Sequence, residues 1–406
     1  MRVLINPGPW LPVPPDGYGG IENIVATLVP ELRRRGVRVV RVVLGTIKQS
    51  ALLADEKFSV YDNPQFGQLQ RPYNRAMGCA AAHMQRIVSE LHRRDDIDLV
   101  HDHLEAVGPT VLGAMGDAAP PVLHTLHWDL AKHPELYGGF DGRGRMYVNG
   151  VSAAQLARAP AALRAHSLGH VYLATPLAER ADRSIGPDKG EYFIVLGRIT
   201  AGKGQHIAAR LAHAVGVDVL LAGPVGPYHQ PAALAAALTT DPEAARNPDV
   251  RYWYDRVIPH LDGHRVRWLG SVCGAERDEI LARARASVFP LQWEEPGGTA
   301  VVESLSLGTP VLGYRRGCLP ELIDEESTGF LVDSGDEDGL AALFRDVAAL
   351  SPAACRRAAA ERFTPSVMAE KYLSLYETVI NRPGGTPRIG DVTAPPASPT
   401  RVTPRR

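Results

Sequence analysis

At 406 residues, the chain is longer than one hydrophobic core usually supports, and its length fits two domains of about 180 residues each. Apolar residues make up 45% of the chain, enough for two buried cores, and the 22% of charged residues is ordinary for a protein in water. The formal net charge of −1 argues against a nucleic-acid partner. No apolar run in the sequence approaches the roughly 20 residues that span a membrane.

The cysteines and the N-terminal residues indicate a reducing compartment. The first residues, M-R-V-L-I-N-P, form too short an apolar run, interrupted too soon by proline, for a signal peptide. The cysteines lack the paired spacing of a disulfide framework or a zinc site, since they lie far apart at positions 79, 273, 318 and 355. We therefore expect a cytoplasmic protein with free thiols.

The chain opens with a strand, a proline-rich loop and a glycine-rich turn. The apolar residues 2–5 predict a short strand, and the sequence G-Y-G-G-I-E, from Gly17, leads into a helix that Gly36 should end. This turn alone is a weak signal for phosphate binding, because many strand–turn–helix units contain glycine. The arginines at 33–35 suit the negative end of the helix dipole; a weak contact with a membrane surface is the alternative interpretation.

Two histidines follow consecutive predicted strands of the first half. Ligands of doubly wound sheets gather outside the carboxyl ends of the strands, so His103 and His127 are placed to contact a ligand. A purely structural role is the alternative for each, and His124 is predicted to pack inside its strand. The predicted strands of this half lie at 37–44, 97–101, 121–128, 148–152 and 171–174, and an alanine-rich helix lies at 73–93.

A flexible segment and a pair of cations mark the start of the second half. Residues 184–190, S-I-G-P-D-K-G, are predicted to be a linker. After a buried strand at 192–196, Arg198 and Lys203 stand on either side of a glycine-containing turn. The two side chains can clamp a diphosphate, arginine through its planar fork and lysine as a point charge. The alternative is two solvated loop charges; a Walker loop is excluded because no Lys-Ser or Lys-Thr pair follows.

Strands and helices continue to alternate, which predicts a second parallel sheet. The aromatic run at 251–254 is predicted to pack inside the domain, because one cluster in a neutral chain does not indicate nucleic-acid stacking. From residue 382 the sequence is rich in proline, glycine and threonine and is predicted to be a disordered tail, residues 382–406. The predicted strands lie at 217–223, 266–272, 287–291, 311–314 and 329–332, and the predicted helices at 336–349 and 366–380.

The segment 293–310, W-E-E-P-G-G-T-A-V-V-E-S-L-S-L-G-T-P, is the richest in functional signals. Gly297 and Gly298 permit a tight turn in which the backbone approaches a ligand closely. Thr299 is predicted to cap a helix over 300–307. The free N–H groups and the dipole at the start of this helix form a site suited to phosphate.

Two carboxylates frame this turn. Glu295 lies in the loop before it, and Glu303 lies about one turn inside the helix. A carboxylate accepts hydrogen bonds from two neighbouring hydroxyls, which suits a sugar or a ribose. The glycines, the helix start and the second glutamate together indicate a glycosyl-phosphate site far more specifically than the spacing of the two glutamates does.

With these residues, the segment resembles the signature of the retaining glycosyltransferases of family 4, and the supporting matches run from about Gly17 to about Glu377. The resemblance implies an α/β protein with the GT-B fold, in which two Rossmann-like, doubly wound domains face a central cleft. It implies an acceptor-side domain at 1–183, a nucleotide-sugar-binding domain at 191–363, and a helix at 364–381 that crosses back to the first domain.

The resemblance also implies roles. Arg198, Lys203 and the start of the 300–307 helix would stabilise the leaving diphosphate. Glu303 would hold the ribose and Glu295 the sugar, and His127 would position the sugar and stabilise an oxocarbenium-like state. The candidate catalytic residues are His127, Arg198, Lys203 and Glu295; the candidate donor-binding residues are Gly19, Gly20, Arg198, Lys203, Glu295, Gly297, Gly298, Thr299 and Glu303; the candidate acceptor-side residues are Tyr18 and His103.

Two acidic triplets are the remaining candidates for a metal site. Asp96-Ile97-Asp98 has the D-x-D pattern that chelates manganese in the other large glycosyltransferase fold, where the acids follow a buried strand. Here they precede a strand, and Asp336-Glu337-Asp338 stands at a helix start. We therefore expect no metal and no cofactor, only a UDP- or GDP-type donor as substrate, with a small-molecule, glycan or lipid acceptor.

Three departures from the family pattern leave other functions open. The usual aromatic residue after Glu295-Pro296 is Gly297, the usual asparagine–glycine turn is Thr175-Pro176-Leu177, and the usual acid before Lys203 is Gly202. The first of these departures, glycine at position 297, changes the wall of the site beside the sugar. A glycosyl phosphorylase, a nucleotide-sugar epimerase and a catalytically silent sugar-nucleotide-binding protein are the alternatives to a transferase.

Overall fold

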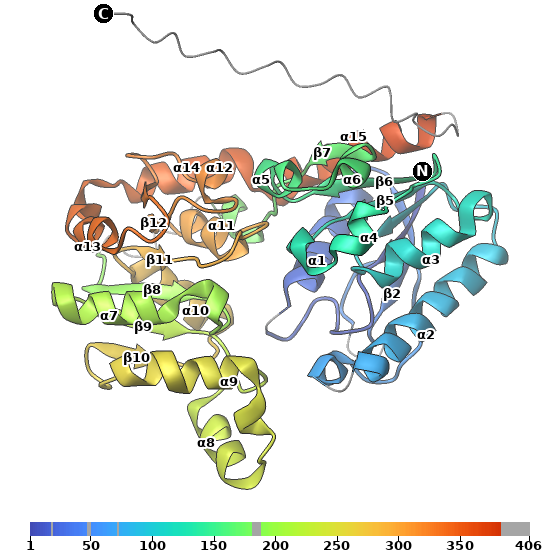
Figure 1. Ribbon diagram of the computed structural model, residues 1–406. Helices are drawn as coiled ribbons and strands as arrows, with labels where there is room; N and C mark the ends of the chain where they lie inside the picture. Colours follow the sequence, from blue (N-terminus) through green and yellow to red (C-terminus); the bar gives the residue numbers. More distant parts are fainter. Residues whose placement is uncertain (18, 47–49, 71–72, 181–187, 383–406) are drawn as a thin grey trace, which may run out of the picture.

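Two parallel β-sheets, each covered by helices, build the protein (Figure 1). The computed structural model describes residues 1–17, 19–46, 50–70, 73–180 and 188–382; Tyr18, most of the predicted linker and almost all of the predicted tail therefore lie outside the described residues. The N-terminal sheet has the order β3-β2-β1-β4-β5-β6-β7, and the C-terminal sheet has the order β10-β9-β8-β11-β12-β13. This is the predicted α/β fold of GT-B type.

The N-terminal domain begins with a strand that is buried on both faces, since Val3, Leu4 and Ile5 are fully inaccessible. Its strands are β1 (Arg2–Asn6), β2 (Arg38–Leu44), β3 (Lys57–Ser59), β4 (Leu99–Asp102), β5 (Val122–Thr125), β6 (Met146–Gly150) and β7 (Ser167–His170). Its helices are α1 (Gly20–Arg34), α2 (Tyr73–His92), α3 (Val107–Met115), α4 (Pro134–Gly138), α5 (Ala153–Ala157) and α6 (Ala161–Arg164).

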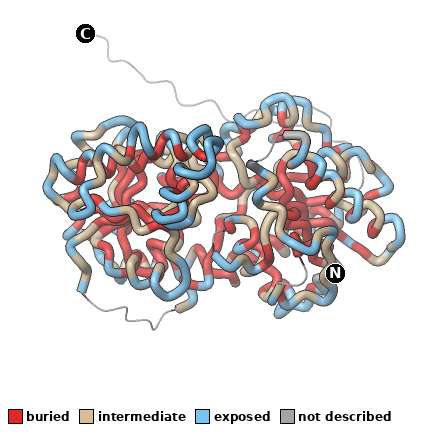
Figure 2. The backbone as a smooth tube through the Cα atoms, turned by 90° about the horizontal axis from the view of Figure 1, so that it is seen from below, coloured by how far each residue is buried: buried red, intermediate tan, exposed pale blue. Residues whose placement is uncertain are grey.

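The C-terminal domain follows the same alternation. Its strands are β8 (Tyr192–Leu196), β9 (Asp218–Ala222), β10 (Val266–Trp268), β11 (Ser287–Phe289), β12 (Val311–Tyr314) and β13 (Gly329–Val332). Its helices are α7 (Gln205–Val215), α8 (Pro231–Thr240), α9 (Pro248–Tyr252), α10 (Gly274–Arg283), α11 (Thr299–Ser306), α12 (Leu319–Leu322), α13 (Glu337–Asp346) and α14 (Pro352–Arg362). Figure 2 shows buried backbone running through the interior of both domains.

The last helix, α15 (Pro365–Asn381), belongs to the N-terminal core although it follows the C-terminal domain in sequence (Figure 1). Its buried residues Met368, Tyr372 and Tyr376 pack in one cluster with Val3 and Leu28 of that domain. The predicted helix that crosses back is therefore present, and it ties the two domains together at the end of the chain.

One predicted strand is wrong. β7 ends at His170; Val171 still donates a backbone hydrogen bond to Gly150 of β6, but residues 171–174 do not form a strand. Their apolar side chains are buried for another reason, because Val171 packs in the N-terminal core and Leu173 lies against the C-terminal domain at Gly297. The sequence analysis did not predict α14, an alanine-rich helix whose buried positions are the small residues Cys355, Ala358 and Ala359.

The acidic triplets have structural partners. Asp96 pairs with Arg94 and with Arg2, and Asp336 accepts a hydrogen bond from the backbone N–H of Gly339 as the cap of α13. Among the described residues, no helix is both long and apolar enough to cross a membrane.

Candidate functional site

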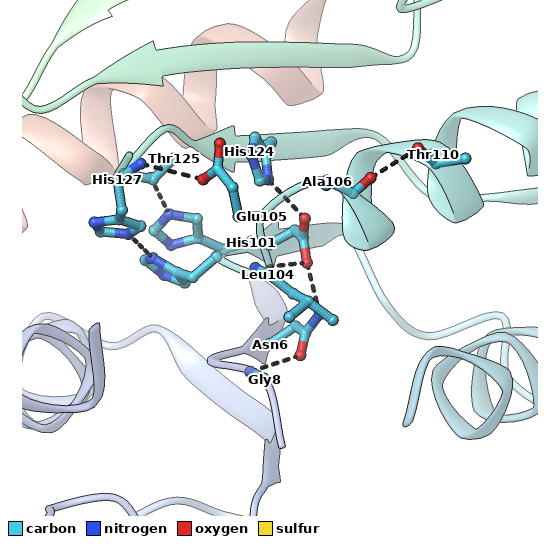
Figure 3. A network of polar contacts seen from close by, with 12 residues as sticks. Asn6, Gly8, His101, Leu104, Glu105, Ala106, Thr110, His124, Thr125 and His127 are labelled. Atoms are coloured by element: carbon cyan, nitrogen blue, oxygen red, sulfur yellow. Dashed lines mark hydrogen bonds and ion pairs between the residues drawn. The ribbon is translucent and has the colours of Figure 1, made fainter. Parts of the chain in front are cut away.

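Four histidines gather where β4 and β5 end, in the part of the N-terminal sheet that Figure 3 shows from close by. His103 and His127 hydrogen-bond through Nδ1 and Nε2 at 2.8 Å, and their rings stack with centroids 5.1 Å apart. Both are therefore at the predicted edge of the sheet and in contact with each other. His101 lies behind them and is fixed by Tyr376 of α15 at 2.6 Å and Thr125 at 2.8 Å.

The charge state of the His103–His127 pair follows from its burial. Burial lowers the pKa of His127 to about 3 and the pKa of His103 well below its ordinary value. Both rings are thus neutral at pH 7, so one nitrogen of each ring donates and the other accepts. A neutral His127 can orient a hydroxyl group, but its single N–H is too weakly acidic to act as a general acid at that pH.

His124 packs inside its strand, as predicted. Its Nδ1 lies 2.6 Å from Oδ2 of Asp102, and both side chains are fully buried. Asp102 also accepts a hydrogen bond from the side chain of Asn6 at 2.6 Å, which links β4 to β1. This network holds the strand ends that carry the other histidines.

The buried acid beside His127 was not predicted. Glu105 follows β4, is 6% exposed, and accepts a hydrogen bond from the backbone N–H of His127 at 3.4 Å. Its other oxygen has no partner among the described residues, and burial raises its pKa to about 7. The next residue, Ala106, has a strained φ of 61°. The only sequence signal was an acid two positions after His103.

The glycine-rich turn lies at the start of α1. Gly19 is the N-cap, and a Cβ there would lie 2.7 Å from Pro15, so the turn requires glycine. Gly20 faces open space. Glu22, in the first turn of α1, is buried, and this burial raises its pKa to about 7.

In the C-terminal domain the loop after β8 presents the two predicted cations. Lys203 forms an ion pair with Glu295, and its ammonium lies 5.4 Å from the ring centroid of Trp293. The residue predicted for the diphosphate thus contacts the residue predicted for the sugar. Arg198 is exposed at the other end of the loop, where its carbonyl accepts a hydrogen bond from Gln205 at 2.8 Å.

Lys132 is a third cation of this region, and sequence reasoning missed it. It comes from the N-terminal domain, in the short turn Leu130–Lys132, and its ammonium lies 5.0 Å from the ring of Trp128 and 5.9 Å from that of Trp293 in the other domain. Burial and the nearby charge of Arg198 lower its pKa. Cations from both domains therefore converge around Trp293.

The glycine turn before α11 packs against the N-terminal domain. A Cβ on Gly297 would lie 2.6 Å from Leu173 and 3.0 Å from Val151, so the missing side chain lets the two domains approach. The predicted N-cap is wrong by one residue. Gly298, with φ 61°, is the N-cap and Thr299 is the first residue of α11, because the left-handed conformation at 298 suits glycine.

Glu303 lies inside α11 as predicted, and a residue from α10 holds it. Its Oε1 accepts a hydrogen bond from Arg277 at 3.0 Å, and burial raises the pKa of its carboxyl group. Arg277 was not predicted to be near the site. The pair leaves Glu303 16% exposed, at a position separate from the Lys203–Glu295 pair.

A cavity of about 180 Å³ lies between the domains beside Glu295. Asp129 and Gln155 line it from the N-terminal domain, and Glu294 and Pro296 line it from the C-terminal domain. No group of three or more His, Cys, Asp or Glu side chains in the part of the chain that the structure describes is arranged to hold a metal ion.

Two family models match this chain. Residues 179–362 match the model described as "Glycosyl transferases group 1", and residues 18–167 match the model described as "Glycosyltransferase Family 4". Together they cover both domains.

Similar proteins agree with these matches. The glycogen synthase of Mycobacterium tuberculosis is 24% identical over 384 residues, 89% of each chain. The D-inositol 3-phosphate glycosyltransferase of Corynebacterium efficiens is 30% identical over 186 residues, 41% of this chain and 38% of that one. Among solved structures, AviGT4, a glycosyltransferase involved in avilamycin A biosynthesis, has a TM-score of 0.61 at 25% identity, over 94% of this chain and 98% of its own. HepE of Anabaena, in complex with UDP-glucose, has the same fold with a TM-score of 0.61 at 17% identity, over 93% of this chain and 100% of its own.

Proposed function

Because this chain is a glycosyltransferase of family 4 with the GT-B fold, we propose that it moves a hexose-type sugar from a nucleoside diphosphate to an acceptor hydroxyl with retention of configuration. The observation that carries the proposal is the convergence of Lys203 and Lys132, from different domains, around Trp293, with Glu295 beside them. This arrangement offers positive charge for a diphosphate and a carboxylate for sugar hydroxyls within one site.

The leaving diphosphate gains negative charge as the glycosidic bond breaks. Arg198, Lys203 and the N-terminus of α11 would stabilise that charge, since fixed cations and free backbone N–H groups act most strongly where charge develops. Lys132 would add its charge from the facing domain. On donor binding, Lys203 would exchange Glu295 for a phosphate, and Glu295 would become free to accept hydrogen bonds from the sugar.

The N-terminal domain would supply the groups above the sugar. His127 is neutral, so it would position a sugar hydroxyl through its ring or backbone carbonyl rather than act as a general acid. Attack would occur on the face that the diphosphate leaves, and the leaving phosphate would take the proton of the acceptor hydroxyl. His103 would hold His127 in one tautomer.

The nucleotide and the acceptor are named here by class. UDP- and GDP-sugars are the proposed donors, and HepE, which has the same fold, is in complex with UDP-glucose. ADP-sugars join the panel because starch synthase IV of Arabidopsis thaliana, also of this fold, is bound to ADP. The acceptor would be a small molecule, a glycan or a lipid with a free hydroxyl.

A screen of nucleoside diphosphates and their sugars by thermal shift tests donor binding. A ligand present at 100 times its Kd adds about 2.7 kcal/mol to the free energy of unfolding, which raises the melting temperature measurably. We expect one nucleotide series to raise it and the others to leave it unchanged. No shift with any nucleotide at millimolar concentration would contradict the proposed donor class.

Turnover is expected to continue without a divalent metal. Lys132, Arg198 and Lys203 supply the positive charge that a metal would otherwise bring to the diphosphate. Initial rates would be measured after dialysis against EDTA and again after addition of manganese or magnesium. Loss of activity with the chelator and its recovery with manganese would show that these three side chains do not replace a metal ion at the diphosphate.

A further inference from the structure

A carboxylate of the C-terminal domain caps a helix of the N-terminal domain. Glu321, in α12, accepts a hydrogen bond from the backbone N–H of Ala153 at 2.8 Å and another from Ala154, one on each oxygen. Tyr172 also donates to it, at 3.1 Å. The first N–H groups of a helix have no partner within the helix, and a carboxylate satisfies them with charge-assisted bonds. Glu321 thereby fixes the start of α5 to the other domain.

The next residue of α5 holds the peptide groups around His127. Gln155 is buried, and its side-chain amide donates to the carbonyls of Leu126 at 3.1 Å and Trp128 at 2.9 Å, on either side of His127. Its side-chain oxygen accepts from the N–H of Val151 at 2.9 Å. With two donors on two carbonyls and its oxygen on an N–H group, the amide has one orientation that satisfies every partner.

A second contact between the domains lies next to α5, at the glycine turn before α11. Gly297, in the turn before α11, lies against Val151, whose N–H is bonded to Gln155. The C-terminal domain thus contacts the N-terminal domain at two neighbouring places, the end of β6 and the start of α5. Gln155, which lies in α5, hydrogen-bonds to the backbone on both sides of His127. Hydrogen bonds at Glu321 and Gln155, the backbone of α5 between them and the packing of Gly297 on Val151 thus connect the C-terminal domain to the residues around His127.

We propose that Glu321 and Gln155 are positioning residues, which set the place of His127 relative to the donor held by the C-terminal domain. The inference rests on the proposed function for the role of His127, whereas the link between Glu321 and His127 stands on the contacts themselves. Neither residue needs to touch the substrate. Their effect would be on the geometry of the reacting sugar and not on the affinity for the nucleotide, which the C-terminal domain binds.

Kinetics of Glu321→Ala and Gln155→Ala test the proposal. A displacement of about 1 Å in a positioning group costs about 100-fold in rate, so we expect kcat to fall roughly ten- to 100-fold in each variant. The Kd for a nucleoside diphosphate should stay within about twofold. Glu321→Gln keeps one acceptor oxygen and should recover part of the loss. The double variant should be no slower than the slower single variant, because both changes break one chain of contacts.

Glu325→Ala is the matched control. Glu325 lies in the same domain, close in sequence, and pairs with Arg315 on the surface, so its removal should leave kcat unchanged. Rate losses that multiply in the double variant, or a normal kcat in Glu321→Ala, would overturn the proposed coupling.

The imidazole ¹⁵N signals of His127 provide a test that needs no turnover. They would be assigned by their loss in His127→Gln and compared between the wild type and Glu321→Ala, both without ligand. We expect the signals to shift or broaden in Glu321→Ala and to stay in place in Glu325→Ala. Unchanged His127 signals would refute the link even if the protein is an active transferase, and shifted signals in a protein without transferase activity would uphold the link while refuting the function.

Discussion

Replacing Lys203 by alanine is expected to lower kcat about 100- to 1000-fold, the usual cost of removing one group that stabilises developing negative charge. The diphosphate of the intact donor carries less negative charge at the breaking bond than the departing diphosphate does, so the Kd for the donor should rise far less than kcat falls. Steady-state kinetics with a saturating donor and calorimetric titration with the donor in the absence of acceptor would measure the two effects separately.

Arg198→Ala provides an independent test of the same idea. Lys203 pairs with Glu295, so its removal also leaves a partly buried carboxylate without a cation, whereas Arg198→Ala leaves that ion pair intact. We expect the same pattern, with kcat affected more than the affinity for the intact donor. Arg246→Ala is the control, since Arg246 lies in the same domain and pairs with Glu243 on the surface. Wild-type kinetics in both Lys203→Ala and Arg198→Ala would place these side chains outside the reaction.

The two glutamates should separate nucleotide binding from sugar binding. If Glu303 holds the ribose, Glu303→Ala should weaken the nucleoside diphosphate and the intact donor alike, by about 10- to 150-fold for a hydrogen bond of about 1.5–3 kcal/mol. Glu295→Ala should not weaken nucleoside-diphosphate binding, because its loss releases Lys203 for the phosphate. It should instead lose donor discrimination and turnover.

Titration of each variant with the nucleoside diphosphate and with the donor decides between these roles. Glu279→Ala, an exposed glutamate of α10, is the control for a change of charge in this domain. Equal losses for both ligands in both variants would mean that the ribose and the sugar are not held by separate carboxylates.

Local patterns made much of the fold and part of the site predictable. Apolar runs such as 192–196 and 311–314 became β8 and β12 with the expected bounds. Lys203 and Glu295, predicted from two separate loops, meet in the structure. The run 171–174 shows where this reasoning fails. An apolar pattern indicates that residues are buried, but it does not indicate whether they form a strand or pack against another domain.

The groups that sequence reasoning missed depend on contacts between distant parts of the chain. Glu321 reaches Ala153 across 168 positions, and nothing near either residue indicates that they meet. Lys132 comes close to Arg198 because two domains face each other. Glu105 is unusual because of its burial, which a polar segment such as H-D-H-L-E does not reveal. Gly297 was seen as a departure from the family pattern, and the structure shows its effect as close packing on Leu173.

Transfer of the sugar itself is the central claim, and NMR of the complete reaction measures it most directly. The donor that raises the melting temperature would be incubated with a panel of hydroxyl-bearing small molecules, glycans and lipids, and the anomeric protons of donor and product followed with time. We predict that nucleoside diphosphate and glycosylated acceptor appear in equal amounts, only when acceptor is present, with the anomeric configuration of the donor. Free sugar released without acceptor, dependence on inorganic phosphate, or a product of inverted configuration would contradict the account.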